Sequence, residues 1–200
     1  MRTDYIKPSA YNKIYHLMQY ENALALRLSL ETGLRIGDVL GLKPDDLEGC
    51  VIRYTAQKTG KSGKKTISAD LAKRLRRISD KHFVFPGRSG DKPRTRQAVW
   101  ADVKKACKRL GIKENVGCHS ARKTYAVELF HEEGLPKVQK ELQHDRGDTT
   151  MLYAFADVLN GKGRTTDADY EALSEMVAEK VAQKVRPMFE KIINICSIDR

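Results

Sequence analysis

The sequence lacks an apolar run that approaches the roughly 18 residues of a membrane span, and it lacks a hydrophobic signal segment. Its few cysteines form no Cys-x-x-Cys pair, which disfavours both a disulfide framework and a zinc ribbon. We therefore expect a soluble protein of a reducing, cytoplasmic compartment, with no membrane partner. The cysteines are Cys50, Cys107, Cys118 and Cys196.

Signatures of nucleotide hydrolysis and of metal binding are also missing. Gly60 to Ser62 read GKS, but a phosphate-binding loop requires a glycine five residues before Gly60, where this chain has Thr55. Cys118 stands beside His119 with no further ligands at the short spacings that zinc sites use. We expect neither a metal nor another cofactor.

Positive charge is plentiful and unevenly distributed. The chain of 200 residues has 37 Lys and Arg against 26 Asp and Glu, a formal net charge of +11. Residues 53–113 contain 19 of the basic residues and only four acidic ones, so the rest of the chain is slightly acidic. A solvated basic surface would spread this charge more evenly, and its concentration favours a nucleic-acid partner.

Helical periodicity dominates the chain, and one pair of β-rich runs interrupts it. Residues 51–56 and 64–68 predict two strands, and the glycines of the intervening QKTGKSG indicate a flexible, lysine-rich hairpin tip. The length suits one substantial domain. The pattern predicts a mainly α protein with a small antiparallel β-sheet, of class α+β. The expected helices cover 9–18, 21–33 (ending at Gly33), 69–78, 95–110, 119–133 (ending at Gly134) and 168–195 (interrupted at Pro187).

Tyr153 lies in a further predicted helix that Asp148 can cap. At 100° per residue, the tyrosine stands beside the apolar stripe that includes Met151, Leu152 and Phe155, and not within it. This position is compatible with a tyrosine at the edge of the core whose hydroxyl is exposed to solvent, and equally with a reactive phenol.

In two places, two charged or titratable residues stand three positions apart in the sequence. His119 and Arg122 share a helix face that continues into apolar residues, and a charged pair that faces inward requires an anion or another partner. Arg35 and Asp38 show the same spacing in RIGDVLGL, where a local ion pair is a sufficient structural explanation.

Five motifs occur in a fixed order: TGLRIGD at 32–38, QKTG at 57–60, HSAR at 119–122, LQH at 142–144, and then Tyr153. This ordered set resembles the catalytic domain of tyrosine recombinases, the phage integrase family. The resemblance implies the fold of that catalytic domain over residues 1–160. It also implies cleavage and rejoining of double-stranded DNA through a 3′-phosphotyrosyl intermediate, without cofactor or metal.

The resemblance assigns the reaction to seven side chains: Tyr153, Arg35, Lys58, His119, Arg122, His144 and Asp38. Tyr153 would be the nucleophile. Arg35 and Arg122 would clamp the attacked phosphate, because a guanidinium fits two phosphate oxygens and stays charged.

The remaining assignments concern protons and support. His119 would be the general base, His144 would donate a hydrogen bond to the phosphate, and Lys58 would protonate the departing 5′-oxygen. Asp38 would orient its basic neighbours. Lys58 competes with Lys61, Lys64 and Lys65 in one flexible loop and is preferred because of its QKTG context.

Relatives usually carry an N-terminal core-binding domain, and here the chain starts almost at the catalytic domain, as a fragment or a minimal enzyme would. Residues 161–200 form a predicted helical tail whose apolar stripe would dock on its own domain or exchange between protomers of a tetramer. The expected function is site-specific recombination or integration of DNA from a mobile element, in a prokaryotic or phage, nucleoid-associated setting. The alternatives are relaxation of DNA like that of a type IB topoisomerase, and a non-catalytic DNA-binding regulator of a full-length recombinase.

Overall fold

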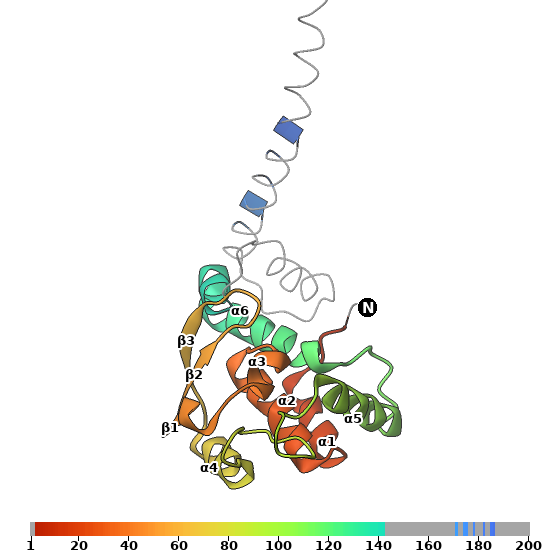
Figure 1. Cartoon of the computed structure of the whole chain (residues 1–200). Coiled ribbons are helices and arrows are strands. Elements are labelled where there is room, and N and C mark those ends of the chain that lie inside the picture. Colours follow the sequence, from red (N-terminus) through yellow and green to blue (C-terminus); the bar gives the residue numbers. More distant parts are fainter. Residues whose placement is uncertain are drawn as a thin grey trace, which may run out of the picture. The chain divides into compact units, whose positions relative to one another are not determined.

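The computed structural model describes residues 3–142 and seven isolated positions between 171 and 186. The chain divides into two compact units, Met1–Tyr153 and Ala154–Arg200, and every labelled helix and strand belongs to the first. The expected domain boundary at residue 160 and the helical tail lie outside the described residues and stay predictions. The elements, shown in Figure 1, are α1 (Pro8–His16), α2 (Tyr20–Thr32), α3 (Ile36–Leu40), η1 (Pro44–Asp46), β1 (Leu47–Glu48), β2 (Val51–Thr55), β3 (Ser62–Thr66), α4 (Ala69–Ile78), α5 (Arg96–Arg109) and α6 (Cys118–Leu142).

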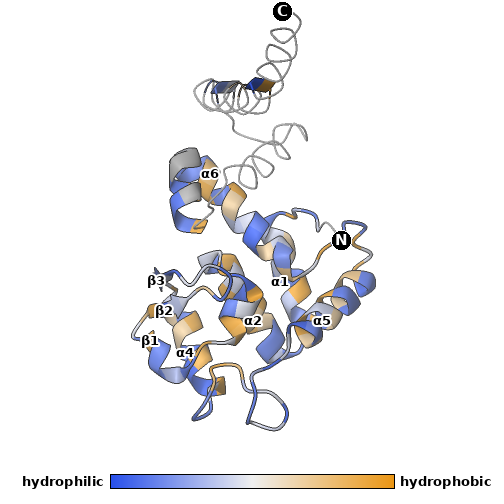
Figure 2. Ribbon diagram, turned by 45° about the horizontal axis from the view of Figure 1, so that its top comes forward, coloured by the Kyte–Doolittle hydropathy of each residue, from blue (hydrophilic) through white to orange (hydrophobic). Residues whose placement is uncertain are grey.

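Helix α2 is the centre of the fold, with α1, α3, α4, α5 and α6 packed against it (Figure 1). Its apolar residues surround the helix axis, and Leu24, Leu26 and Leu28 are all buried. A helix that is buried on most of its sides is stable only inside a core. By contrast, α4 and α5 show hydrophobic and hydrophilic sides in Figure 2, as expected for helices with one buried face.

The predicted hairpin is confirmed and extends a three-stranded antiparallel sheet in the order β1-β2-β3. Ile52 pairs with Lys65, and Tyr54 pairs with Gly63. The expectation that Gly63 belongs to the hairpin tip is therefore wrong: β3 begins at Ser62, so Gly63 lies within the strand. Strand β1 has only two residues, which is too short for a periodic signal in the sequence.

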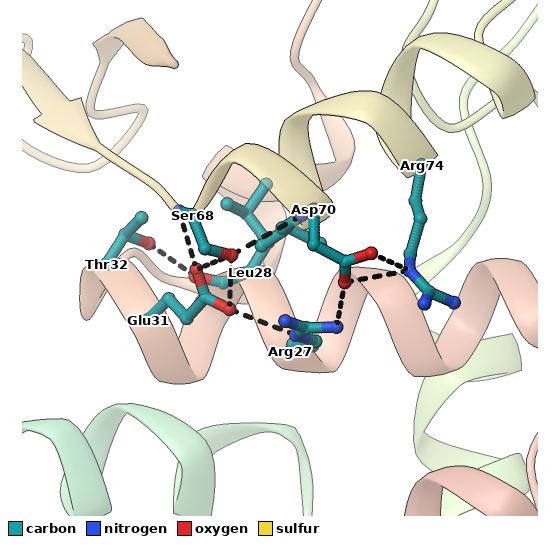
Figure 3. A network of polar contacts seen from close by, with 8 residues as sticks. Arg27, Leu28, Glu31, Thr32, Ser68, Asp70 and Arg74 are labelled. Atoms are coloured by element: carbon teal, nitrogen blue, oxygen red, sulfur yellow. Dashed lines mark hydrogen bonds and ion pairs between the residues drawn. The ribbon is translucent and has the colours of Figure 1, made fainter.

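A polar network joins the start of α4 to α2 (Figure 3). The Ser68 hydroxyl accepts a hydrogen bond from the backbone N–H of Leu71 and so caps α4, while Ser68 donates from its own backbone and hydroxyl to Glu31. Arg27 bridges Glu31 to Asp70. Exposed ion pairs stabilise a fold little, but a cap is typically worth about 1 kcal/mol. The network therefore fixes the direction in which the chain leaves β3.

Helix α6 bends at Gly134, where φ of 75° and ψ of 177° depart from helical values. The predicted end of the helix at Gly134 is confirmed in this sense, and a short second part continues to Leu142. Ala126, Leu129 and Phe130 are buried, as the predicted inner face requires.

Gly33 ends α2 in the left-handed conformation, with φ of 70°, and it donates its backbone N–H to the carbonyl of Ser29. A Cβ atom built here would lie 2.4 Å from the ring of Tyr125 and 3.0 Å from Leu142. Glycine is thus required twice, by backbone conformation and by the close approach of α6. The predicted C-terminal glycine of this helix is confirmed.

We expect Gly33→Ala to lower the free energy of unfolding by about 3 kcal/mol or more, because left-handed strain and a clash with Tyr125 add together. Gly49→Ala is a matched control, since Gly49 has φ of 58° but nothing within 4 Å of its Cβ position. It should cost only about 1 kcal/mol. Urea denaturation of both variants measures the difference, and equal losses would contradict the proposed close approach.

Candidate active site

Asp38 connects helix α3 to the hairpin loop. Its carboxylate is buried and accepts a hydrogen bond of 2.9 Å from the backbone N–H of Gln57, whose side-chain amide in turn donates to the carbonyl of Gly37. Within the described residues, Asp38 forms no ion pair with Arg35. The simple explanation of these two residues as a local ion pair is therefore wrong, and Asp38 anchors the loop instead.

Lys58 follows Gln57 directly and lies in the turn between β2 and β3, with an exposed side chain. The turn is closed by hydrogen bonds from the backbone N–H groups of Thr59 and Gly60 to the carbonyl of Ala56. Asp38 holds the residue before Lys58, so the loop that carries this lysine is attached to the helix that Arg35 precedes.

Arg122 is buried, with 4 % of its surface exposed, in the first turns of α6. Its guanidinium donates from Nη1 to the carbonyl of Gly33 at 2.5 Å and from Nη2 to the carbonyl of Leu142 at 2.8 Å. Both carbonyls lie at helix ends, where no intrahelical donor is available. Arg122 thus connects the end of α2, the start of α6 and the end of α6 through one planar group.

His119 stands in the first turn of α6, one turn before Arg122. The prediction that both residues face inward is correct for Arg122 but wrong for His119, which is partly exposed to solvent although its neighbours Cys118 and Ser120 are buried. Desolvation by the surrounding protein and the charges of Arg122, Lys123 and Arg35 lower the pKa of His119 from 6.5 to about 4. The imidazole is therefore neutral at pH 7.

Arg35 occupies the position before the first residue of α3, with an extended backbone, a half-buried side chain and no capping hydrogen bond. Its guanidinium makes no hydrogen bond or ion pair with another residue of the described segment. Because its charge acts on both His119 and Tyr54, Arg35 belongs to the same cluster as Arg122. Two arginines and a neutral histidine are thus brought together from separate parts of the sequence.

Tyr54 is a site residue that the sequence alone did not reveal. It is buried on β2, and burial followed by the carboxylate of Glu141 raises the pKa of its phenol, while Arg122 and Arg35 oppose that change. Its place in the strand alternation beside buried Ile52 was the available signal.

Lys65 was also missed as a structural residue. It is buried on β3, forms an ion pair with Glu141, and lies with its Nζ atom 5.3 Å from the ring centroid of Tyr125. Burial, followed by the charge of Glu141, raises the pKa of Tyr125 to about 12. In the sequence Lys65 is one of the lysines that compete with Lys58, and its burial against a carboxylate distinguishes it from Lys58, Lys61 and Lys64, which are exposed.

The structure thus brings the charges of Arg35 and Arg122 to bear on His119, and it ties Asp38 to the backbone of the residue before Lys58. The exposed side chain of Lys58 makes no contact with these residues that would place it in the site, so its role stays a prediction. His144 and Tyr153 lie outside the described residues, so their positions stay predictions. Among residues 3–142 and the isolated positions beyond them, no group of three or more His, Cys, Asp or Glu could hold a metal ion. No helix in this described part is long and apolar enough to cross a membrane.

The fold occurs in solved structures of recombinases. A lambda integrase dimer bound to a COC′ core site superposes with a TM-score of 0.65 over 76 % of this chain and 48 % of that one, at 20 % identity. The catalytic domain of bacteriophage HP1 integrase gives a TM-score of 0.60 over 77 % of this chain and 88 % of that domain, at 19 % identity. At these identities the likeness establishes the tyrosine recombinase catalytic-domain fold and nothing further, and the expected fold class is confirmed.

Sequence relatives agree with the fold. Tyrosine recombinase XerD of Lacticaseibacillus casei is 31 % identical over 141 residues, which cover 63 % of this chain and 47 % of the relative. Tyrosine recombinase XerC of Rhizobium meliloti is 29 % identical over 148 residues, 68 % of this chain and 46 % of the relative. The chain therefore spans about half the length of these relatives. The profile of the phage integrase family matches residues 4–158, and the chain belongs to that family.

Proposed function

We propose that this chain is the catalytic domain of a site-specific DNA recombinase that cleaves and rejoins DNA through a 3′-phosphotyrosyl intermediate. The observation that supports this proposal most is the cluster of Arg35, Arg122 and a neutral His119, with Lys58 held nearby through Asp38. Phosphoryl transfer needs this combination of fixed cations and proton carriers.

The arginines suit the phosphate on which the reaction takes place. Negative charge develops on its oxygens in the pentacoordinate transition state, so preorganised cations that bind this state more tightly than the ground state lower the barrier. The carbonyls of Gly33 and Leu142 hold the guanidinium of Arg122 in one plane. Arg35 would approach the phosphate from the start of α3.

Proton transfer completes the proposed step. The oxygen of Tyr153 bonds to phosphorus as the bond to the 5′-oxygen breaks; the phenolic proton passes to His119, and Lys58 supplies a proton to the leaving oxygen. His119 is neutral at pH 7 and so can accept a proton, and the negative charge of a bound phosphate would raise its basicity toward the range that suits a general base. The reverse sequence would rejoin the strand without external energy.

Double-stranded DNA is the proposed partner. The segment 53–113 carries 19 basic and four acidic residues, a charge of +15 against +11 for the whole chain, and it includes the hairpin loop, α4 and α5. Family membership, together with the solved structures of recombinases in complex with DNA, supports this choice. Assembly as a tetramer on DNA would place two cleavage sites together for exchange.

Replacement of the nucleophile is the first test. We expect the chain to be trapped covalently on a nicked suicide DNA substrate, and Tyr153→Phe to abolish the adduct on denaturing gels while DNA affinity persists. Tyr20→Phe, at an exposed tyrosine on α2, should form the adduct normally. DNA binding without any adduct from the unmodified chain would contradict the proposed catalysis.

The protonation of His119 gives a second test. The folded-state pKa of His119 is about 4, below the ordinary 6.5, so the unfolded chain binds a proton on this residue more readily than the folded one. The free energy of unfolding should therefore be unaffected by His119 above about pH 6.5 and should decrease as pH falls from 6.5 toward 4. An NMR titration, assigned with a His119→Gln variant, should give a midpoint near 4. In Arg35→Gln the midpoint should rise, since one repelling charge is removed. A midpoint near 6.5 in the unmodified chain would argue against the neutral base.

Asp38 is expected to act by positioning Lys58. Asp38→Ala removes the acceptor of the Gln57 N–H, and we expect adduct formation to slow by about tenfold or more, because the loop that carries Lys58 loses a charged hydrogen bond to α3. DNA affinity should change little. Asp45→Ala, at an exposed carboxylate of η1, is the control, and equal rates for both variants would exclude the anchoring role.

A further inference from the structure

Lys65 is unusual among the lysines of the hairpin because it faces the protein interior. Its neighbours Lys64 and Thr66 are exposed, whereas Lys65 is 9 % exposed and lies on the same strand face as buried Ile67. A buried ammonium group is costly unless charged and polar partners surround it.

The partners of Lys65 all belong to α6. Its Nζ atom forms an ion pair with the carboxylate of Glu141, lies 3.4 Å from the carbonyl oxygen of the same residue, and lies 3.5 Å from the hydroxyl of Tyr125. A cation that binds the last carbonyls of a helix satisfies otherwise unpaired acceptors and complements the helix dipole. Lys65 therefore acts as a C-terminal cap supplied by a neighbouring strand.

The helix turn held by Lys65 is also held by Arg122, which donates to the carbonyl of Leu142. Both contacts follow the break at Gly134, so the short second part of α6 depends on contacts from outside itself. A helix of this length is not stable alone. In the sequence, His144 follows Leu142 by two residues.

We propose that Lys65 and Glu141 are a pair of positioning residues that fixes the last turn of α6 against the sheet, and through it the entry of the segment that carries His144. The catalytic part of this inference rests on the proposed function of His144. Neither residue takes part in the chemistry. The pair instead holds the turn of α6 whose Leu142 carbonyl accepts a hydrogen bond from Arg122.

The test uses the full chain and two independent readouts. Lys65→Met removes the charge but keeps much of the side-chain volume, and Glu141→Gln removes the opposite charge from a more exposed position. Lys64→Met is the matched control, because it removes an adjacent lysine that is exposed on the other face of the strand. Lys65→Arg retains the charge and should anchor α6 nearly as well as the unmodified chain does.

Hydrogen exchange measures the anchoring directly. We expect Lys65→Met and Glu141→Gln to speed amide exchange in residues 138–142 by about tenfold, the effect of losing a charged hydrogen bond, while α2 remains protected. Lys64→Met should leave the exchange unchanged. Unchanged exchange in both test variants would overturn the proposal, whether or not the chain forms an adduct with DNA.

Adduct kinetics measure the consequence for the reaction. We expect Lys65→Met to slow covalent trapping on the nicked substrate by about tenfold, with DNA affinity within about twofold, and Lys65→Arg to recover most of the rate. Faster exchange with an unchanged trapping rate would overturn the positioning role and leave only a structural one. If the unmodified chain forms no adduct, the proposed function fails, and the exchange data alone decide whether the pair anchors α6.

Discussion

A buried guanidinium is the constraint on which this site depends. Arg122 cannot leave its charge in a core without partners, and it finds them in the carbonyls of Gly33 and Leu142. Each contact satisfies an acceptor and a donor together. Because the guanidinium is planar, the two contacts fix both the ends of the helices and the orientation of the arginine.

The charge arrangement around His119 follows from the same packing. Bringing the starts of α3 and α6 together places Arg35, Arg122 and Lys123 near one imidazole, and these charges help to keep it neutral. An arriving phosphate would reduce the repulsion among the cations. The site is therefore electrostatically suited to a phosphate before any substrate is present, which is the preorganisation that phosphoryl transfer requires.

Anchoring contacts surround the proposed reactive groups. Asp38 holds the backbone beside Lys58, Lys65 holds the end of α6, and Gly33 lets the ring of Tyr125 approach closely. Each of these contacts limits the freedom of an element that carries a proposed reactive side chain. Small displacements of reacting groups cost large factors in rate, so such contacts matter to function.

The sequence by itself determined the helical pattern, the hairpin, the glycine that ends α2 and the ordered motifs, because these depend on local periodicity, backbone conformation and residue type. Only the tertiary structure decided that Asp38 accepts a hydrogen bond from Gln57 and forms no ion pair with Arg35. It also decided that His119 is exposed while Arg122 is buried, and that Lys65 forms an ion pair with Glu141 of α6. Local patterns fix which face a residue occupies. They do not say which distant carbonyl or carboxylate will lie opposite it, because that depends on how the helices pack around α2.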